Sequence, residues 1–154
     1  MFIMLYHAAV MQEPPELTAS TGYLLARAGA ASRRMWARML AGHGLTPHHF
    51  GVLMLLDQAG AASHQDLSHG VGIDPRNAVP VVDHLAQRGL VHRQPDPTDR
   101  RRNTITLTTA GRAILQDLRG AGDQVEEHLL DCLTTAERTD LHRTLLKLLA
   151  CADG

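Results

Sequence analysis

Apolar residues recur at helical spacing over residues 17–41 and again through the segment that follows. The first segment carries two adjacent apolar stripes and predicts a long helix that more than one neighbour buries. Thr46 and Pro47 then form a typical helix start, an N-cap followed by proline at the first helical position. The run that ends before Gly60 is nearly all apolar, which predicts a central helix.

The same spacing returns near the end of the chain, where it predicts two more helices. We expect Thr109 to cap the first of them, and Gly120 and Gly122 to bend or loosen it. Thr134 and Glu137 have the spacing of a capping box and predict the start of the last helix.

Between these helices, residues 63–107 predict two short helices and a hairpin. Gly72 falls at the turn between the helices, and the second helix, residues 74–88, begins with an aspartate N-cap and a proline. Two short strands, residues 90–94 and 103–108, flank a polar loop that is rich in arginine. A helix, a turn, a second helix and such a hairpin, in this order, predict a winged helix-turn-helix.

Two segments give the chain a resemblance to the MarR family of bacterial transcriptional regulators: LAQRGLV, residues 85–91, and DPTDRRRNTITLTTAG, residues 96–111. The likeness extends over about residues 17–150. It implies a mainly α fold with a small β-wing, built as a winged helix-turn-helix DNA-binding domain with long N- and C-terminal dimerisation helices. The expected parts are a leader or arm at 1–16, a single domain at 17–150, a winged lobe at 45–112, and dimerisation helices at 17–43 and 113–150.

The second helix of the motif has the size of a helix that enters the major groove. Arg76 and Asn77 lie in its first turn, where an arginine can pair with guanine and an asparagine with adenine. The alternative is that both are solvated first-turn residues. Pro80 departs from the family pattern, and it either kinks the helix or offers an apolar surface to a thymine methyl group. The predicted DNA-binding residues of the motif are Ser63, His64, Asp74, Arg76, Asn77 and Pro80.

The loop of the hairpin carries three consecutive arginines, Arg100, Arg101 and Arg102. A guanidinium on a stiff hairpin suits the narrow minor groove of A·T-rich DNA. We therefore predict that these arginines bind DNA, although a solvated charged loop has the same composition. Asp96 and Asp99 are expected to brace the wing, and the resemblance implies that Asp99 pairs with Arg101.

The resemblance also implies a homodimer on a pseudo-palindromic operator, and a small-molecule site between the dimer helices and the winged lobe. An aromatic or phenolic effector is the expected ligand, and a repressor released by it is the expected function. Core packing explains the aromatic residues of this segment equally well. The pocket residues predicted from the sequence are Trp36, His43, His48, His49 and Phe50.

Other regulatory chemistries have weaker sequence support. Cys132 and Cys151 form neither a disulfide framework nor a metal ligand set, and we expect them to be small buried thiols on the dimer helices. His48 and His49 are adjacent and His43 is near, but no second cluster lies at ligand spacing on the long helix that follows the hairpin. A zinc- or redox-sensing regulator, and a DNA-binding protein without any ligand, remain the alternatives. We predict no cofactor and no enzymatic activity, because no catalytic fingerprint is present.

Charge is unevenly distributed along the 154 residues, although the net charge is only −1. Residues 27–112 carry a balance of +5, and residues 113–154 carry −4. This asymmetry fits a protein that presents one side to a polyanion. The apolar start, residues 1–11, has no basic leader and is too short to cross a bilayer, so we expect a cytoplasmic protein without a membrane anchor. Residues 1–16 are either a frayed leader or an arm that packs on a partner subunit.

Overall fold

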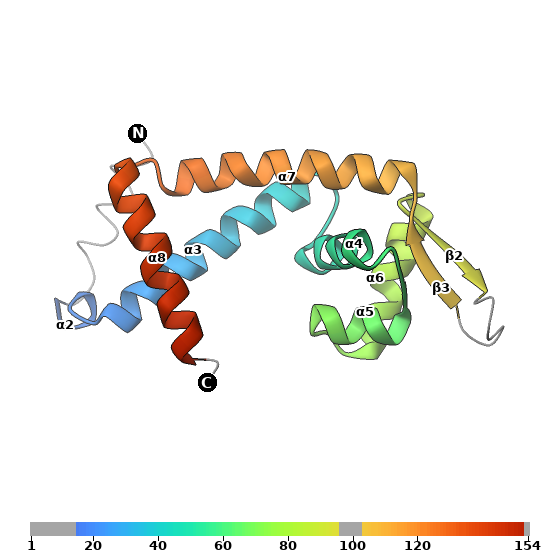
Figure 1. Cartoon of the computed structure of the whole chain (residues 1–154), viewed down its shortest axis with the longest axis horizontal. Coiled ribbons are helices and arrows are strands. Elements are labelled where there is room, and N and C mark those ends of the chain that lie inside the picture. Colours follow the sequence, from blue (N-terminus) through green and yellow to red (C-terminus); the bar gives the residue numbers. More distant parts are fainter. Residues whose placement is uncertain (1–14, 96–102, 153–154) are drawn as a thin grey trace.

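The fold is an elongated, mainly helical arrangement with a small sheet at one end, as a computed structural model shows (Figure 1). The structure describes residues 15–95 and 103–152. Helix α7 extends along the molecule and joins the lobe at one end to the helices α3 and α8 at the other (Figure 1). The elements are α2 (Pro15–Thr18), α3 (Thr21–Gly42), α4 (Pro47–Ala59), β1 (Ala61–Ser63), α5 (His64–Val71), α6 (Pro75–Gln87), β2 (Val91–Pro95), β3 (Asn103–Leu107), α7 (Thr109–Leu129) and α8 (Thr135–Ala152). The winged helix-turn-helix architecture predicted from the sequence is confirmed.

Side-chain caps fix where the long helices begin. Ser20 caps α3, so the helix starts at residue 21 and not at residue 17, and the short α2 precedes it. Thr46 caps α4 as predicted. Thr108, and not Thr109, caps α7: its hydroxyl accepts a hydrogen bond from the Gly111 N–H at 2.9 Å. The Thr108 hydroxyl also donates to the carbonyl of Gly89 at 2.7 Å, which joins the cap to the preceding hairpin.

The core of the lobe lies where α4 contacts α5, α6, α7 and the sheet. Val52, Leu53 and Leu56 of α4 are almost fully buried. This burial explains why the sequence of α4 is apolar nearly all round. The other residues of this core cluster are Leu40, Leu45, Ala62, Leu67, Val82, Leu85, Leu90, Val91, Ile105, Leu107, Leu115 and Leu118.

The sheet has three antiparallel strands in the order β1-β3-β2. The hairpin β2–β3 is the predicted wing, with Gln94 opposite Thr104. The sequence did not predict β1, because its three residues, Ala-Ala-Ser, are too few to show an alternating pattern. In the fold, Ala62 is buried opposite Ile105, and β1 anchors the start of α5 to the base of the wing.

Helix α7 continues through Gly120 and Gly122, the two glycines that were predicted to bend or loosen it. Gly122 is buried against α3, where a Cβ atom would lie only 2.5 Å from the Trp36 ring. The glycine therefore permits a close approach of two helices, which is a packing role.

Helix α8 lies, with α3, at the end of the molecule opposite the lobe (Figure 1). It begins with the predicted capping box: the Thr134 N–H donates to the Glu137 carboxylate at 2.8 Å, and the Glu137 N–H donates to the Thr134 hydroxyl at 3.4 Å. None of its residues is buried in the single chain, although it is rich in leucine. Within the described ranges, no helix has both the length and the hydropathy that a membrane span requires.

Candidate nucleic-acid interface

The helix-turn-helix is held by local hydrogen bonds at each of its corners. The Ser63 hydroxyl donates to the Asp66 carboxylate at 2.6 Å and accepts from the Asp66 N–H at 3.2 Å, which closes a capping box at the start of α5. Gly72 ends α5 in the left-handed conformation, with φ of 69°. Asp74 then caps α6 by accepting from the Arg76 N–H at 2.8 Å. Ser63 and Asp74, both predicted DNA contacts, therefore have a structural role in this motif.

Helix α6 buries one face and exposes the other. Ala78, Val82 and Leu85 are buried against α4 and α5. The predicted base-reading residues, Arg76 and Asn77, are exposed in the first turn. The structure thus presents both residues on the open side of the lobe.

Pro80 lies inside α6, and the helix continues through it to Gln87. A proline removes the N–H that would bond to the carbonyl four residues earlier, here that of Arg76. The Pro80 ring is exposed, so it does not disturb the packing of the buried face. The structure therefore shows an exposed apolar surface at Pro80 on a continuous helix.

An ion pair joins α6 to the base of the wing. The Arg93 guanidinium of β2 donates to the Asp83 carboxylate of α6. His64, a predicted DNA contact, is partly buried beside this pair. Burial and then the Arg93 charge lower the pKa of His64, while Asp83 acts in the opposite direction. His64 is therefore a neutral residue at the base of the wing at neutral pH, and its Nδ1 atom is buried without a hydrogen-bond partner in the part of the chain that the structure describes.

The tip of the wing lies outside the described residues. This segment, residues 96–102, includes every predicted wing residue: Arg100, Arg101, Arg102, Asp96 and Asp99. Their roles stay predictions. The two strands that carry the tip are described and paired up to Pro95 and Asn103.

The predicted ligand residues only partly come together. Trp36 and Phe50 have ring centroids 5.6 Å apart. His43 belongs to the end of α3, where its Nδ1–H donates to the Met39 carbonyl at 3.0 Å. His48 is exposed in the first turn of α4.

His49 is buried and forms part of the α4 capping box: its Nδ1 accepts from the Thr46 N–H at 2.9 Å. Burial, together with repulsion by His84, lowers the pKa of His49 to about 4. Its ring faces that of His84, with 4.5 Å between the centroids. His49 is therefore a neutral structural residue at neutral pH.

A hollow of about 500 Å³ lies elsewhere, between α3, α7 and α8, and Trp36 is the one predicted pocket residue that lines it. Ser32 joins Trp36 from α3, and Leu141 and Leu145 line it from α8. Carboxylates from α7, Asp123 and Glu126 among them, are also part of its wall.

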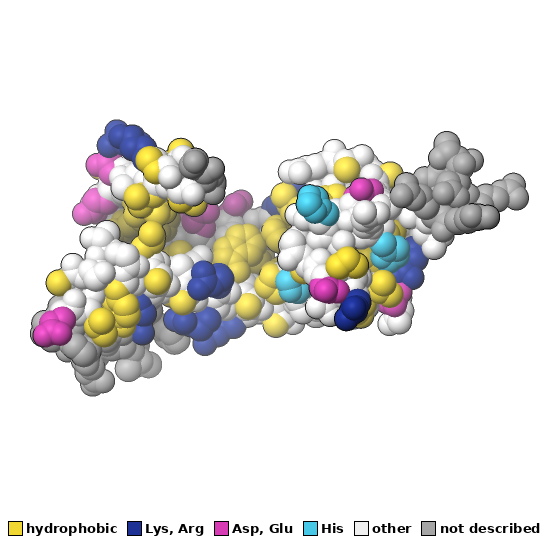
Figure 2. Space-filling view, turned by 90° about the horizontal axis from the view of Figure 1, so that it is seen from below, with side chains coloured by type: hydrophobic (Ala, Val, Ile, Leu, Met, Phe, Trp, Pro, Cys, Tyr) yellow, Lys and Arg dark blue, Asp and Glu magenta, His cyan; other side chains and the backbone are white. Residues whose placement is uncertain are grey.

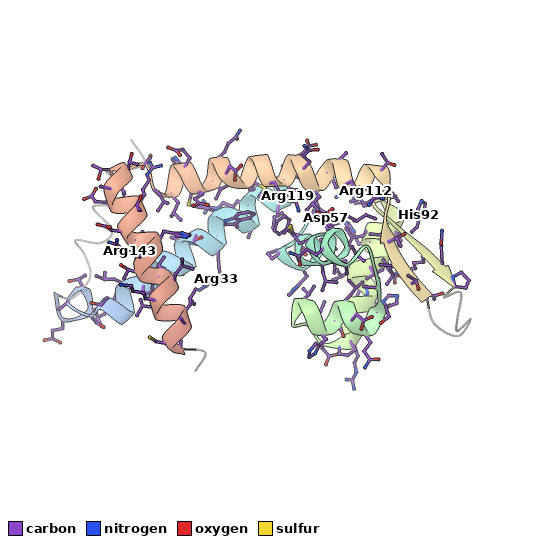
Figure 3. All side chains as sticks on the ribbon, in the orientation of Figure 1. Arg33, Asp57, His92, Arg112, Arg119 and Arg143 are labelled. Carbon is purple, nitrogen blue, oxygen red and sulfur yellow. The ribbon has the colours of Figure 1, made fainter. Side chains whose placement is uncertain are left out.

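Two sets of contacts join the lobe to the long helices, and sequence analysis found neither. The Arg88 guanidinium at the end of α6 donates to the carbonyls of His43 at 2.8 Å and Gly44 at 3.2 Å, and the His84 Nε2–H donates to that of Gly44 at 3.1 Å. At the junction of α7 and α4, the Arg119 guanidinium bonds the Asp57 carboxylate at 2.8 Å (Figure 3). At least forty residues separate the partners in each case, so no local pattern reveals them.

The two cysteines correct one expectation. Both are exposed free thiols in the single chain, and Cys132 lies in the turn between α7 and α8. The expectation of buried thiols is therefore wrong for the single chain. The structure shows no group of three or more potential metal ligands among its described residues.

Comparisons with known proteins agree with this geometry. The family model described as "MarR family" matches residues 45–102. The repressor NicR of Pseudomonas putida is 28% identical over 136 residues, which are 88% of this chain and 86% of NicR. The structure of the transcriptional repressor CouR bound to a 23-mer DNA duplex is 31% identical, with a TM-score of 0.74, and the match covers 89% of this chain and 97% of CouR. Bordetella bronchiseptica BpsR, solved in a study of its regulation by 6-hydroxynicotinic acid, is 29% identical with a TM-score of 0.68 over 88% of this chain and 97% of BpsR.

Proposed function

Because this chain belongs to the MarR family of winged helix-turn-helix DNA-binding transcriptional regulators, we propose that it acts as a homodimeric repressor on a pseudo-palindromic operator. The observation that carries the proposal is the exposed first turn of α6, with Arg76 and Asn77 on a helix whose opposite face is buried in the lobe. Each residue can make a bidentate contact to a purine in the major groove. The wing arginines, Arg100, Arg101 and Arg102, contact the adjacent minor groove or phosphates in this proposal.

The proposed dimer rests on the apolar surface at the end of the molecule opposite the lobe. Hydrophobic side chains reach the surface where α3 and α8 lie (Figure 2). The exposed leucines of this end are Leu17, Leu24, Leu25, Leu141, Leu146, Leu148 and Leu149. A surface of this kind on a monomer favours association. A second copy that packs its own α3 and α8 here would bury these leucines and fill the hollow beside Trp36. In this arrangement residues 17–43 and 113–150 serve dimerisation, and residues 45–112 form the DNA-binding lobe.

Two copies related by a twofold axis would place their recognition helices in successive major grooves, roughly 34–36 Å apart. The test is footprinting on the DNA upstream of the chain's own coding sequence, with the molar mass measured by light scattering. We expect a dimer and a protected site with twofold symmetry. A monomer at micromolar concentration, or protection without symmetry, would contradict the proposed assembly.

Point variants separate the two proposed kinds of DNA contact. Replacing Arg100 and Arg102 by Ala is expected to weaken binding to all sequences and to reduce its salt dependence, because fewer counterions are released. Arg76→Ala is expected to relax base preference, with a loss of about 1–3 kcal/mol of discrimination. If all three arginines can be removed without any change in operator binding, the proposed docking is wrong.

For the effector, we propose a small aromatic or phenolic acid that binds near Trp36 and Phe50 and releases DNA. The similarity to BpsR and the contact between the two rings support this proposal. His43 follows α3, the helix of Trp36, and His48 and His49 lie on α4, the helix of Phe50. His49 is part of the capping box, so His43 and His48 are the candidates for polar contacts with the ligand. A ligand that binds more tightly to a dimer with altered helix spacing would release the operator by differential affinity alone.

The effector is tested separately from DNA binding. Thermal shift and DNA-release assays should use 6-hydroxynicotinic acid and other aromatic acids as probes, with aliphatic acids of equal charge as controls. A stabilised protein that loses its operator supports the effector proposal. If the protein binds its operator and no aromatic acid alters this binding, the effector proposal is refuted, and the proposal of a DNA-binding repressor stands.

A further inference from the structure

Helix α6 exposes a large apolar side chain that the fold does not need. Val79 is 46% exposed, and it is followed by the exposed Pro80. The other large hydrophobic residues exposed to this degree in the described part of the chain lie on α2, α3 and α8, where the proposed dimer would bury them. Val79 is the exception, because it lies in the DNA-binding lobe.

Helical spacing places Val79 next to the predicted base-reading residues. Pro80 follows Arg76 by four positions and Val79 follows it by three, so the three side chains are neighbours on the surface of α6. Asp83, four positions after Val79, is held by Arg93 at the base of the wing. Val79 and Pro80 therefore form an apolar edge between the first turn of α6 and the wing.

The major groove offers one apolar feature on its base edges, the 5-methyl group of thymine. A valine or proline that contacts this group removes apolar area of both partners from water. We propose that Val79 and Pro80 read thymine methyl groups, and that the operator half-site carries thymines within about one or two base pairs of the base that Arg76 contacts. The spacing follows from one helical turn of about 5.4 Å against a base-pair rise of about 3.4 Å. This inference rests on the proposed docking of α6 in the major groove.

The test uses deoxyuridine, which pairs like thymine but lacks the methyl group. A preferred duplex is first selected from random sequences, and each thymine is then replaced singly by deoxyuridine. Binding is measured by fluorescence anisotropy at one salt concentration. For the wild-type protein we expect affinity to fall about fourfold at one or two thymines of each half-site, the effect of one methyl group that is no longer buried.

In Val79→Ala or Pro80→Ala, the loss of affinity on replacing a specific thymine by deoxyuridine should fall below about twofold. The variant should bind the uracil duplex about as well as the wild type does. Gln87→Ala, an exposed change at the other end of α6, is the control and should keep the full loss of affinity. Circular dichroism checks that each variant is folded.

Three outcomes would overturn the inference. In the first, the wild-type protein binds thymine and uracil duplexes equally at every position. In the second, the loss of affinity on replacing thymine by deoxyuridine is the same in Val79→Ala and Pro80→Ala as in the wild type. In the third, the Gln87→Ala control no longer shows this loss. A wild-type protein that selects no duplex at all would also remove the proposed function, so the two failures are distinguishable.

Discussion

The contact between α7 and α3 predicts opposite effects for the same substitution at two glycines of one helix. A Cβ atom at Gly122 would lie 2.5 Å from Cη2 of Trp36, and 3.1 and 3.3 Å from two further atoms of the ring. Phe50 lies on another side of the ring, with 5.6 Å between the ring centroids, so the ring can yield only by moving toward the hollow that it lines. At Gly120, two residues earlier, a Cβ atom would meet no atom within 4 Å.

The magnitudes follow from these distances. Overpacking of this kind costs about 1–3 kcal/mol, and alanine in a helix regains up to about 1 kcal/mol relative to glycine. Gly122→Ala should therefore lower the free energy of unfolding by about 1–2 kcal/mol. Gly120→Ala should raise it by about 0.5–1 kcal/mol, because only the helix propensity changes.

Urea denaturation followed by circular dichroism measures both values. The protein concentration must be the same for all samples, because the stability of a dimer depends on it. The expected difference between the two variants is about 2 kcal/mol. If Gly122→Ala proves as stable as Gly120→Ala, α7 and α3 do not pack as closely as described, and the assignment of Gly122 to the helix contact is wrong.

Three further predictions concern the start of α7, a buried histidine and the contact at the end of α6. Gly111→Ala should destabilise the fold by about 3 kcal/mol or more in urea denaturation, because its Cβ atom would lie 2.0 Å from the Leu90 carbonyl oxygen; unchanged stability would contradict this close approach. His49 binds a proton less readily when folded, with its pKa lowered from 6.5 to about 4, so its contribution to stability should decline as the pH falls from about 6.5 to 4. In His49→Gln the glutamine can still form the capping bond but does not titrate, so the free energy of unfolding should depend less on pH over this range. A variant whose free energy of unfolding depends on pH as much as that of the wild type would refute the role of His49. Arg88→Ala should lower the free energy of unfolding by about 1 kcal/mol, because it loses the hydrogen bonds to two loop carbonyls. Gln87→Ala should change the free energy of unfolding by no more than about 0.5 kcal/mol in the same urea denaturation assay.

The helices were predictable where a local chemical signal marks their ends. Thr46 with Pro47, Asp74 with Pro75, and Thr134 with Glu137 each identify a helix start because the capping bond joins neighbouring residues. The cap of α7 was misplaced by one residue, because Thr108 and Thr109 are adjacent and either hydroxyl suits the position. The strand β1 escaped prediction, since it acquires its strand character from pairing with β3.

The candidate site was predictable in part. The exposed first turn of α6 follows from the periodicity of its buried residues, so the exposure of Arg76 and Asn77 was predictable from sequence alone. The role of His49 was not, because a histidine in the third position of a helix reveals neither its burial nor its bond to the residue three positions earlier. The Arg88 and Arg119 contacts depend on helices that meet only in the folded chain.

The hydrogen bonds from Arg88 and His84 to the loop after α3 fix the C-terminal end of α6 to the end of α3. The first turn of α6 lies 13 residues away from these bonds, roughly 20 Å at 1.5 Å per residue, on a helix whose buried face is packed into the lobe. A small rotation of the lobe about this contact would thus move Arg76 further than it moves the contact itself. The position of the first turn of α6 is therefore coupled to the orientation of α3 through these bonds.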